Sequence, residues 1–292
     1  MSFLQEFDIR FWSQPCSESI RKRAIYGLEH GLILFLPHLT FEVTEAESRF
    51  LSPIWSDGRS KNINLDGEKD LLKGARGSEP DLSELRGMIK RFAAQAKGLI
   101  QVLLPSYAPF LTQARTSFRP VQVEERPTSY KKDDRRLHVD AFPSRPNYGE
   151  RILRVFTNVN AAGQPRVWKA GEPFEDMARR FLPDIQGPIP GSAWLLNALG
   201  ITKGKRSLYD HVMLQLHDRL KKDMAYQQQA PQREIAFPAQ STWLVFSDQV
   251  LHAALSGQFM FEQTFHLPVH ALSEPETAPL RVLERLLARP LI

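Results

Sequence analysis

The hydrophobic period of this sequence changes near residue 116, from a spacing typical of helices to one typical of strands. The segment DLSELRGMIKRFAAQAKGLIQVLLPSY carries apolar residues three and four positions apart, which predicts a long helix with one buried face that Pro105 ends. Asp81 or Ser83 is the expected N-cap of this helix. After residue 116 the apolar runs are short, rich in Val, Phe, Thr and Trp, and separated by turn-forming residues, which is typical of antiparallel sheets or a barrel.

The order of these signals predicts an α+β chain. The expected strands lie in SFRPVQVEER, RILRVFTNVN, REIAF, STWLVFSD, LHAALS and QFMFEQTFHLPV. We predict a helical N-terminal region (residues 1–115) packed on a β core (116–270), with a helical insertion at about 161–232 that contains GSAWLLNALG and SLYDHVMLQLHDRLKKDMAYQQQ. A C-terminal region (271–292) ends in the amphipathic helix APLRVLERLLARPLI, which we expect to dock on the core, with a dimer contact or a membrane-surface helix as alternatives.

Composition narrows the classes of function. The formal net charge is +5 over 292 residues, without a basic tail, which favours an anionic substrate or membrane surface over nucleic acid. The single cysteine, Cys16, excludes an internal disulfide framework and a cysteine-rich zinc site. No signal-peptide pattern is visible, and the apolar run GLILFLPHL is too short to span a bilayer. We expect a cytoplasmic protein, either free or attached peripherally to the inner face of the inner membrane.

The sequence HVD places His138 and Asp140 one residue apart, and His252 starts a later apolar run just after a turn. Two imidazoles and one carboxylate on one face leave positions open on Fe(II) for oxygen and a cosubstrate. In an antiparallel barrel, the turn before His252 would return its side chain to the same end as HVD. An H-x-D pattern alone is weak and a lone histidine is more often a core residue, so a polar turn in a basic loop stays open.

The rest of the chain offers little competing chemistry. It contains no HExxH, Walker A, GxSxG or GxGxxG motif. His211 and His217 lie six residues apart on an expected helix and do not share a face cleanly. His266 stands near a strand end, where it is a candidate to line the same cavity as HVD.

Three stretches, HVDAFPSRP, GERILRVFTNVN and STWLVFSDQVLHAALSGQFMFEQTFHLP, together resemble the Kdo 3-hydroxylases, over most of residues 116–270. These are Fe(II)/2-oxoglutarate/O2-dependent dioxygenases that act on the Kdo sugar of the lipopolysaccharide inner core. The resemblance implies a double-stranded β-helix (jelly-roll) core, with His138, Asp140 and His252 as iron ligands. It also implies Fe(II) as cofactor, 2-oxoglutarate and O2 as cosubstrates, and conversion of the Kdo of Kdo-lipid A to its 3-hydroxylated form, Ko.

A cosubstrate with a distal carboxylate needs a buried cation or several hydrogen-bond donors. Many relatives of this fold carry an Arg or Lys on the strand after the second histidine, but FMFEQTFHLP has neither. Strand alternation puts Arg154 and Asn158 on one face of RILRVFTNVN, and the bidentate fork of Arg154 makes it the leading candidate. A solvent-facing strand surface is the alternative for Arg154. The weaker candidates on neighbouring strands are Gln263, Thr264 and Arg119.

Three arginines bracket HVD and are candidates to bind the carboxylate of a sugar acid or a lipid phosphate: Arg135, Arg136 and Arg145. An arginine of this kind, taken singly, is more often a solvated loop charge. Tyr148 and Trp168 are candidates to pack on a sugar ring, or else belong to the core. The expected partner is an anionic Kdo-containing glycolipid, without nucleic acid or an obligate protein partner, and residues 32–36 and the C-terminal helix are the expected membrane contacts.

Two other functions stay open at this level. The first keeps the iron and 2-oxoglutarate chemistry but acts on a small soluble acid. The second is a non-catalytic jelly roll that binds anionic glycolipid through its basic surface. A nucleic-acid demethylase is weaker, because the basic excess is small and no groove-reading helix or base-stacking module is apparent.

Overall fold

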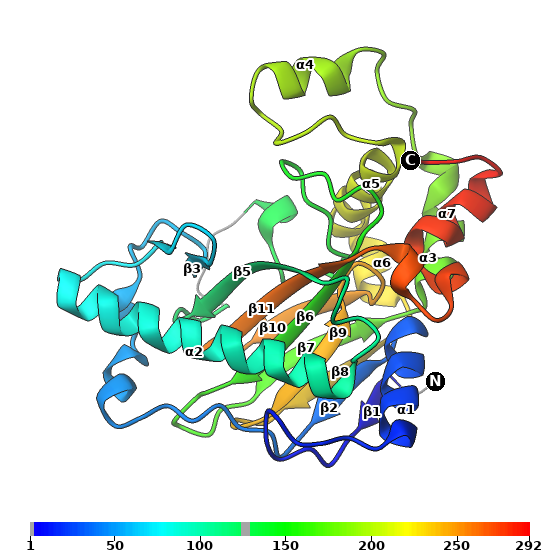
Figure 1. Cartoon of the computed structure of the whole chain (residues 1–292). Coiled ribbons are helices and arrows are strands. Elements are labelled where there is room, and N and C mark those ends of the chain that lie inside the picture. Colours follow the sequence, from blue (N-terminus) through cyan, green and yellow to red (C-terminus); the bar gives the residue numbers. More distant parts are fainter. Residues whose placement is uncertain (1–2, 124–128) are drawn as a thin grey trace.

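The computed structural model describes residues 3–123 and 129–292, and in this part of the chain two sheets form the centre of the molecule (Figure 1). The larger sheet has the strand order β1-β2-β9-β6-β11-β5-β3-β4, and the smaller one has the order β10-β7-β8. Strands β1 and β2 are parallel and the other neighbours are antiparallel. The strands of the larger sheet are β1 (Leu4–Glu6), β2 (Ile33–Leu36), β3 (Ile63–Asp66), β4 (Leu71–Lys73), β5 (Thr112–Arg119), β6 (Arg151–Asn158), β9 (Thr242–Phe246) and β11 (Met260–Leu267); those of the smaller sheet are β7 (Arg166–Gly171), β8 (Gln232–Phe237) and β10 (His252–Ser256).

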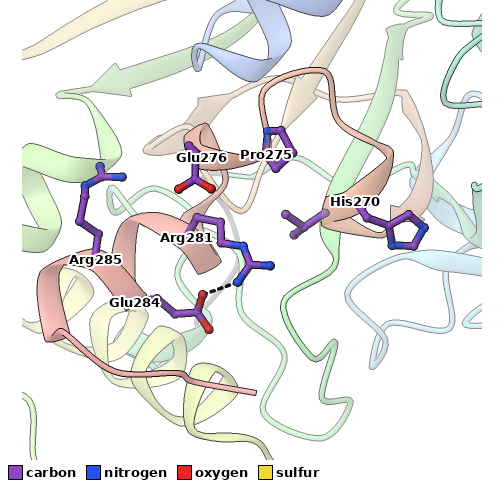
Figure 2. A pocket seen from close by; sticks show the side chains of 7 residues that line it. His270, Pro275, Glu276, Arg281, Glu284 and Arg285 are labelled. Atoms are coloured by element: carbon purple, nitrogen blue, oxygen red, sulfur yellow. Dashed lines mark hydrogen bonds and ion pairs between the residues drawn. The ribbon is translucent and has the colours of Figure 1, made fainter.

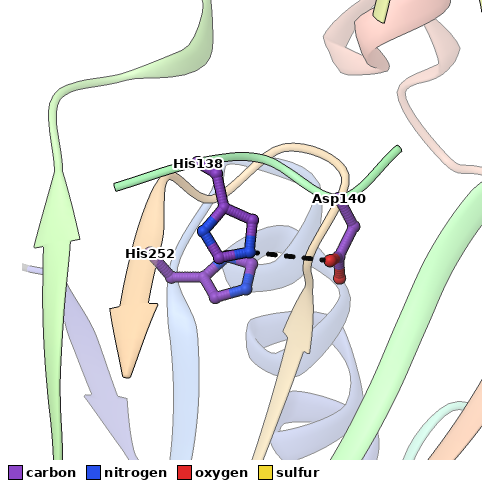
Figure 3. A group of neighbouring side chains, drawn as sticks. All are labelled: His138, Asp140 and His252. Atoms are coloured by element: carbon purple, nitrogen blue, oxygen red, sulfur yellow. Dashed lines mark ion pairs between the residues drawn. The ribbon is translucent and has the colours of Figure 1, made fainter. Parts of the chain in front are cut away.

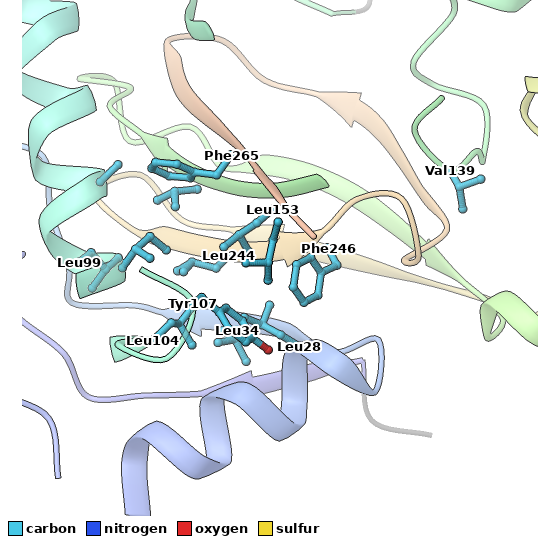
Figure 4. Packing of buried hydrophobic residues seen from close by; sticks show 14 of the residues in the cluster. Leu28, Leu34, Leu99, Leu104, Tyr107, Val139, Leu153, Leu244, Phe246 and Phe265 are labelled. Atoms are coloured by element: carbon cyan, nitrogen blue, oxygen red, sulfur yellow. The ribbon is translucent and has the colours of Figure 1, made fainter. Parts of the chain in front are cut away.

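Helices cover one face of the large sheet and surround one end of the molecule. They are α1 (Glu18–Glu29), α2 (Glu79–Leu103), α3 (Phe174–Phe181), α4 (Ser192–Ala198), α5 (Leu208–Lys222), α6 (Met224–Gln229) and α7 (Pro279–Leu287). The long helix α2 lies across the large sheet, and its buried stripe, which includes Phe92 and Leu99, packs on the sheet in the main hydrophobic core (Figures 1 and 4). Burial of such an amphipathic face supplies most of the stability of a helix in a folded protein.

A second apolar cluster fills the space between the two sheets. Phe156 and Trp243 of the large sheet meet Trp168 and Phe237 of the small sheet, and the rings of Phe237 and Trp243 stack with centroids 4.1 Å apart. Leu153 and Val155 belong instead to the main core with α2. Strand β6 therefore alternates faces as the sequence predicted, but both of its faces are buried.

The N-terminal region differs from the expectation that it is mostly helical, because it contributes β1 to β4 to the large sheet. The run GLILFLPHL supplies β2, in which Leu34 and Leu36 are fully buried, so residues 32–36 are not available to a bilayer. A short apolar run does not distinguish a strand from a buried helix, and here pairing with β9 decides. The N-cap of α2 is also earlier than expected, since Ser78 accepts a hydrogen bond from the Asp81 N–H.

The second half matches the expected element types more closely. Strands β6, β8, β9, β10 and β11 lie where they were predicted, and β5 ends at Arg119. The last residues of SFRPVQVEER, 124–126, lie outside the described residues. The expected helical insertion contains α4, α5 and α6, but also strand β7 and helix α3, which the sequence pattern did not predict.

The C-terminal helix α7 is docked on the body of the protein. Leu280, Val282 and Leu283 are buried in the main core, and α7 contacts α3. Its apolar face is therefore not free for a bilayer. In the part of the chain that the structure describes, no helix is both long and apolar enough to cross a membrane.

Candidate metal centre

The HVD segment forms a short extended piece that pairs with the start of β10. The His138 N–H donates to the His252 carbonyl at 3.0 Å, and the His252 N–H donates to the His138 carbonyl at 2.9 Å. The Asp140 N–H donates to the Ser247 carbonyl at 2.8 Å, just after β9 ends. Because side chains alternate along extended backbone, His138 and Asp140 share one face while Val139 is buried in the core on the other (Figure 4).

This pairing brings the three predicted ligands together (Figure 3). One ligand atom from each of His138, Asp140 and His252 lies within 4.8 Å of the other two, and His138 Nε2 is 3.9 Å from an Asp140 carboxylate oxygen. Among residues 3–123 and 129–292 this is the one group of His, Cys, Asp or Glu side chains found with such spacing. The centroids of the two imidazole rings are 4.6 Å apart, and both histidines are buried.

Hydrogen bonds to the backbone set the tautomer of both histidines. His138 Nδ1 lies 2.7 Å from the Arg136 carbonyl, and His252 Nδ1 lies 2.8 Å from the Val250 carbonyl. A carbonyl oxygen only accepts, so each Nδ1 carries the proton and each Nε2 presents its lone pair to the centre of the cluster. This donor set fits a divalent transition metal that keeps positions open for other ligands.

The electrostatics of the site favour the ligand forms of all three side chains. Burial, helped by the charge of Lys221, holds the pKa of His138 well below its usual range, and burial also lowers the pKa of His252. Burial alone would raise the pKa of Asp140, but the Arg154 charge, the two neighbouring histidines and a hydrogen bond from Ser247 together outweigh burial and hold that pKa well below the usual range. At neutral pH the site therefore consists of two neutral imidazoles and one carboxylate.

A network of buried charges surrounds the three ligands. Arg154 reaches Asp140 at 2.9 Å and Glu262 at 2.6 Å. Arg119 pairs with the other oxygen of Glu262 and lies 3.6 Å from Asp134. The described network holds four cations and three carboxylates, so it carries one excess positive charge before any metal is added: Lys61, Arg119, Arg154 and Lys221 against Asp134, Asp140 and Glu262.

Of the five predicted cosubstrate residues, the structure brings Arg154 and Arg119 into this network, and the Thr264 hydroxyl donates to Glu262 at 3.2 Å. Gln263 is paired with Val155 and faces the α2 side of the sheet, where its side-chain carbonyl accepts from the Thr116 hydroxyl at 2.7 Å. Asn158 donates to the carbonyls of Gln164 and Phe237 and holds the turn after β6. Neither of those two amides points at the metal ligands.

The three arginines predicted for substrate differ in their surroundings. Arg135 forms an ion pair with Asp133 at 2.8 Å, and Arg136 donates to the Lys221 carbonyl at 2.7 Å. Arg145 is exposed on the loop that follows Asp140, and its charge lowers the pKa of His266. Arg145 is therefore at the rim of the site, whereas Arg136 mainly connects the HVD segment to α5.

The two aromatic candidates for packing on a sugar ring differ in burial. Trp168 is only 2% exposed and stacks on His252 with ring centroids 5.1 Å apart. It belongs to the core and fixes the orientation of the His252 ring. Tyr148 is 48% exposed and adopts a positive φ of 51° at the surface.

Several residues near the ligands were missed by the sequence analysis. His217 and Lys221 lie four apart on α5, and the His217 ring packs edge-on against His138 with centroids 5.5 Å apart. That spacing was a usable signal, because residues four apart share a helix face. Glu262, Asp134 and Arg166 were also missed; Arg166 lies two residues before Trp168 on β7, is 1% exposed and donates to the Gly257 carbonyl at 2.7 Å.

One recess lies beside the candidate metal ligands, and a second lies at the C-terminal helix α7. A small one beside the metal ligands is lined by Asp140, Ala141, Phe142, Asn147, Tyr209, Asp210 and Met213. A larger surface pocket lies at α7 and is lined by Val269, His270, Pro275, Glu276, Arg281, Glu284 and Arg285, with an ion pair between Arg281 and Glu284 (Figure 2). None of the three metal-ligand candidates lines that second pocket.

The chain is similar in sequence and in structure to known proteins. Residues 11–290 match the model of a family described as 3-deoxy-D-manno-oct-2-ulosonic acid (Kdo) hydroxylase. A crystal structure of the Kdo hydroxylase KdoO, a non-heme Fe(II) alphaketoglutarate-dependent dioxygenase, in complex with cobalt(II) is 50% identical, with a TM-score of 0.97 over 100% of this chain and 98% of that one. The KdoO complex with alphaketoglutarate and Fe(III) is 49% identical, with a TM-score of 0.96 over 99% of this chain and 97% of that one. No curated protein sequence matches the chain.

Proposed function

The chain belongs to the Kdo hydroxylase family, and from this premise we propose that it is an Fe(II)- and 2-oxoglutarate-dependent dioxygenase that hydroxylates the Kdo of an anionic glycolipid. The observation that carries the proposal is the group of His138, Asp140 and His252, with its ligand atoms within 4.8 Å of one another. Two imidazoles and a carboxylate are the donor set of non-heme Fe(II) oxygenases.

The protein's part in the reaction is to hold and shield this centre. Bound iron would couple the oxidation of 2-oxoglutarate to succinate and CO2 with hydroxylation of a substrate carbon by O2. The backbone carbonyls of Arg136 and Val250 fix the two imidazole rings through their Nδ1–H groups. Arg154 holds one oxygen of Asp140, and Trp168 covers the His252 ring.

We assign the distal carboxylate of 2-oxoglutarate to Arg154 and Arg119. Both side chains are only 11% exposed, and the Nε of each has no hydrogen-bond partner within the described part of the chain. A buried donor without an acceptor is unfavourable, and an incoming carboxylate would satisfy it. The excess positive charge of the network supports the same assignment.

We also propose that the two sheets are the two halves of a double-stranded β-helix. Two features support this architecture. Antiparallel strands face each other across the aromatic cluster that contains Phe156 and Trp168. The HVD segment pairs with β10 of the small sheet and also bonds to Ser247, which directly follows β9 of the large sheet.

The assignment of substrate rests on charge and on the family. Kdo is a sugar acid, and Arg145 is the exposed cation at the rim of the site that would meet its carboxylate. Arg135 and Arg136 are engaged with Asp133 and the Lys221 carbonyl, and we assign them to shaping the rim. Peripheral contact with the membrane that holds the glycolipid is part of the proposal.

The deciding experiment is an anaerobic titration of metal-free protein with Fe(II) and then 2-oxoglutarate. The expected result is the visible charge-transfer band of a chelated 2-oxoacid in the wild type, absent from His138→Ala and from His252→Ala. His270→Ala is the matched control, because His270 is exposed and lies outside the metal site. Absence of the band from well-folded wild-type protein would reject the oxygenase function.

Substrate class is tested separately with the same protein in air. If succinate formation is coupled to Kdo-lipid A, the hydroxylase proposal stands. If only small soluble acids stimulate it, the iron chemistry stands and the glycolipid assignment is wrong.

A further inference from the structure

Residues 186–206, which we call the α4 flap, stand away from the body of the protein at the end where α5 lies (Figure 1). Five of the thirteen exposed large hydrophobic side chains of the described residues lie in this segment: Ile189, Trp194, Leu195, Leu199 and Ile201. Their exposed fractions run from 51% for Leu195 to 77% for Ile189. Single exposed hydrophobics are ordinary, but a cluster of them marks a site of interaction.

Charge identifies the kind of partner. Between Asp184 and Asp210 the sequence has no acidic residue, and it has three cations, Lys203, Lys205 and Arg206. Lys203 and Lys205 are exposed. An apolar tip that carries a tryptophan, flanked by cations and free of carboxylates, is complementary to an anionic lipid bilayer. A protein partner would present charges of both signs, so a flap that bound a protein would not need to lack Asp and Glu.

The flap is anchored directly to the rim of the metal centre. The Lys203 N–H donates to the Ser144 carbonyl at 2.8 Å, and the Arg206 guanidinium donates to the Pro143 carbonyl. Pro143 and Ser144 follow the metal ligand Asp140 by only three and four residues. At its other end the flap is held by Gln215 of α5, which donates to the Gln186 carbonyl at 2.6 Å. A bilayer that holds the flap therefore also holds the rim of the site beside its surface.

We propose that the α4 flap docks the protein on an anionic membrane by inserting Trp194, Leu195 and Leu199 at the level of the lipid headgroups, with Lys203 and Lys205 against lipid phosphates. This deepens the proposed function and rests on its glycolipid substrate, because a substrate anchored in a bilayer must reach the metal centre from that surface. It replaces residues 32–36 and the C-terminal helix as the membrane contact, since both are packed in the core.

The test is flotation of the full-length protein with vesicles that contain phosphatidylethanolamine and phosphatidylglycerol, compared with phosphatidylcholine alone. We expect binding to the anionic vesicles, and at least tenfold weaker binding of Trp194→Ser/Leu199→Ser. The matched control is Phe11→Ser/Ile54→Ser, which removes two side chains that are 69% and 58% exposed elsewhere and should bind like the wild type. Lys203→Gln/Lys205→Gln should weaken binding to anionic vesicles by about tenfold and have little effect on neutral ones.

Each other outcome rejects the proposal. Wild-type protein that binds no vesicle, or a Trp194→Ser/Leu199→Ser variant that binds as tightly as the wild type, overturns it. Displacement from vesicles by millimolar inorganic phosphate would show a phosphate site and not bilayer insertion. A loss of self-association in that variant without a loss of vesicle binding would assign the flap to a second copy of the chain. None of these measurements needs iron or substrate, so failure here is distinguishable from failure of the proposed function.

Discussion

The guanidinium of Arg154 lies 2.9 Å from the carboxylate of Asp140, so a residue in the middle of β6 holds a candidate metal ligand that comes from a loop. The same guanidinium lies 2.6 Å from Glu262 on the neighbouring strand β11. Arg154 thereby connects the large sheet to the metal centre. A change at this residue should affect metal geometry, cosubstrate binding and stability together.

Arg154→Gln should weaken 2-oxoglutarate binding to the Fe(II) protein by about 100-fold, since one charge-assisted pair is lost at a buried site. It should also lower the free energy of unfolding by about 3 kcal/mol, because Asp140 and Glu262 lose a buried partner. Arg154→Lys keeps the positive charge but loses the bidentate geometry of the guanidinium. Its 2-oxoglutarate affinity and its free energy of unfolding should therefore lie between those of the wild type and of Arg154→Gln. Anaerobic titration and chemical denaturation measure both quantities, with the exposed Arg145→Gln as the stability control; normal 2-oxoglutarate affinity in Arg154→Gln would contradict the assignment.

Divalent metal should stabilise the folded protein, because the three ligands come together only in the native state. At a free Co(II) concentration about 100 times the dissociation constant, the gain is about 2.7 kcal/mol. His252→Ala should show no such gain. Thermal unfolding with and without Co(II), and after chelation, checks this, and an equal rise in Tm for His252→Ala would place the metal elsewhere.

Glu29 connects the N-terminal region to the rest of the protein. It is fully buried and accepts from the Tyr107 hydroxyl at 2.6 Å and from the backbone N–H groups of Ser273 and Glu274 at 2.8 and 2.7 Å. Glu29→Ala should lower the free energy of unfolding by about 3 kcal/mol, because the buried Tyr107 hydroxyl and two part-buried N–H groups lose their acceptor. Glu18→Ala on the exposed face of α1 should leave the free energy of unfolding nearly unchanged, because the Glu18–Lys22 pair is solvent-exposed. Similar effects of the two variants in denaturant would mean that the N-terminal region is not tied to the core through Glu29.

His266 should make the protein less stable in mild acid. Burial, with the charges of Arg154 and Arg145, lowers its pKa from 6.5 to about 4. Between these values the unfolded chain binds more protons than the folded one, so stability is retained at pH 7 and falls as the pH drops from 6.5 toward 4. This group contributes about 2 kcal/mol to the loss, allowing for its partial exposure. Denaturation of wild type and His266→Gln at pH 7 and 4.5 measures the difference, and parallel losses in both proteins would rule out this role.

The sequence predicted the structure best where a local hydrophobic pattern, or a set of metal-binding residue types, was present. The stripe of apolar residues in α2 has a period that only a helix satisfies, and five of the expected strands are where alternation and turn residues placed them. HVD and the later His252 were recognisable because the residue types are those a metal requires, and one strand end plus one turn suffices to bring them together.

Other features of the structure could not be predicted from the residues next to them in the sequence. The apolar run at β2 reads equally as helix or strand, and only its pairing with β9 decides between them. Gln263 and Glu262 are adjacent in sequence, but the register of β11 against β6 turns one to α2 and the other to the metal centre. Lys221 at the end of α5 reads as a solvated lysine, yet it is 1% exposed and lies beside Asp134.

What the sequence determined by itself is the set of chemical groups and the local periods: two histidines and an aspartate able to bind a metal, a long amphipathic helix and a series of antiparallel strands. Only the tertiary structure decided which charges meet those ligands, which apolar segments stay exposed at α4, and which are buried at β2 and α7. The physical reason is that periodicity reports the face on which a side chain lies, whereas its partner depends on strand register and on packing between segments far apart in the chain.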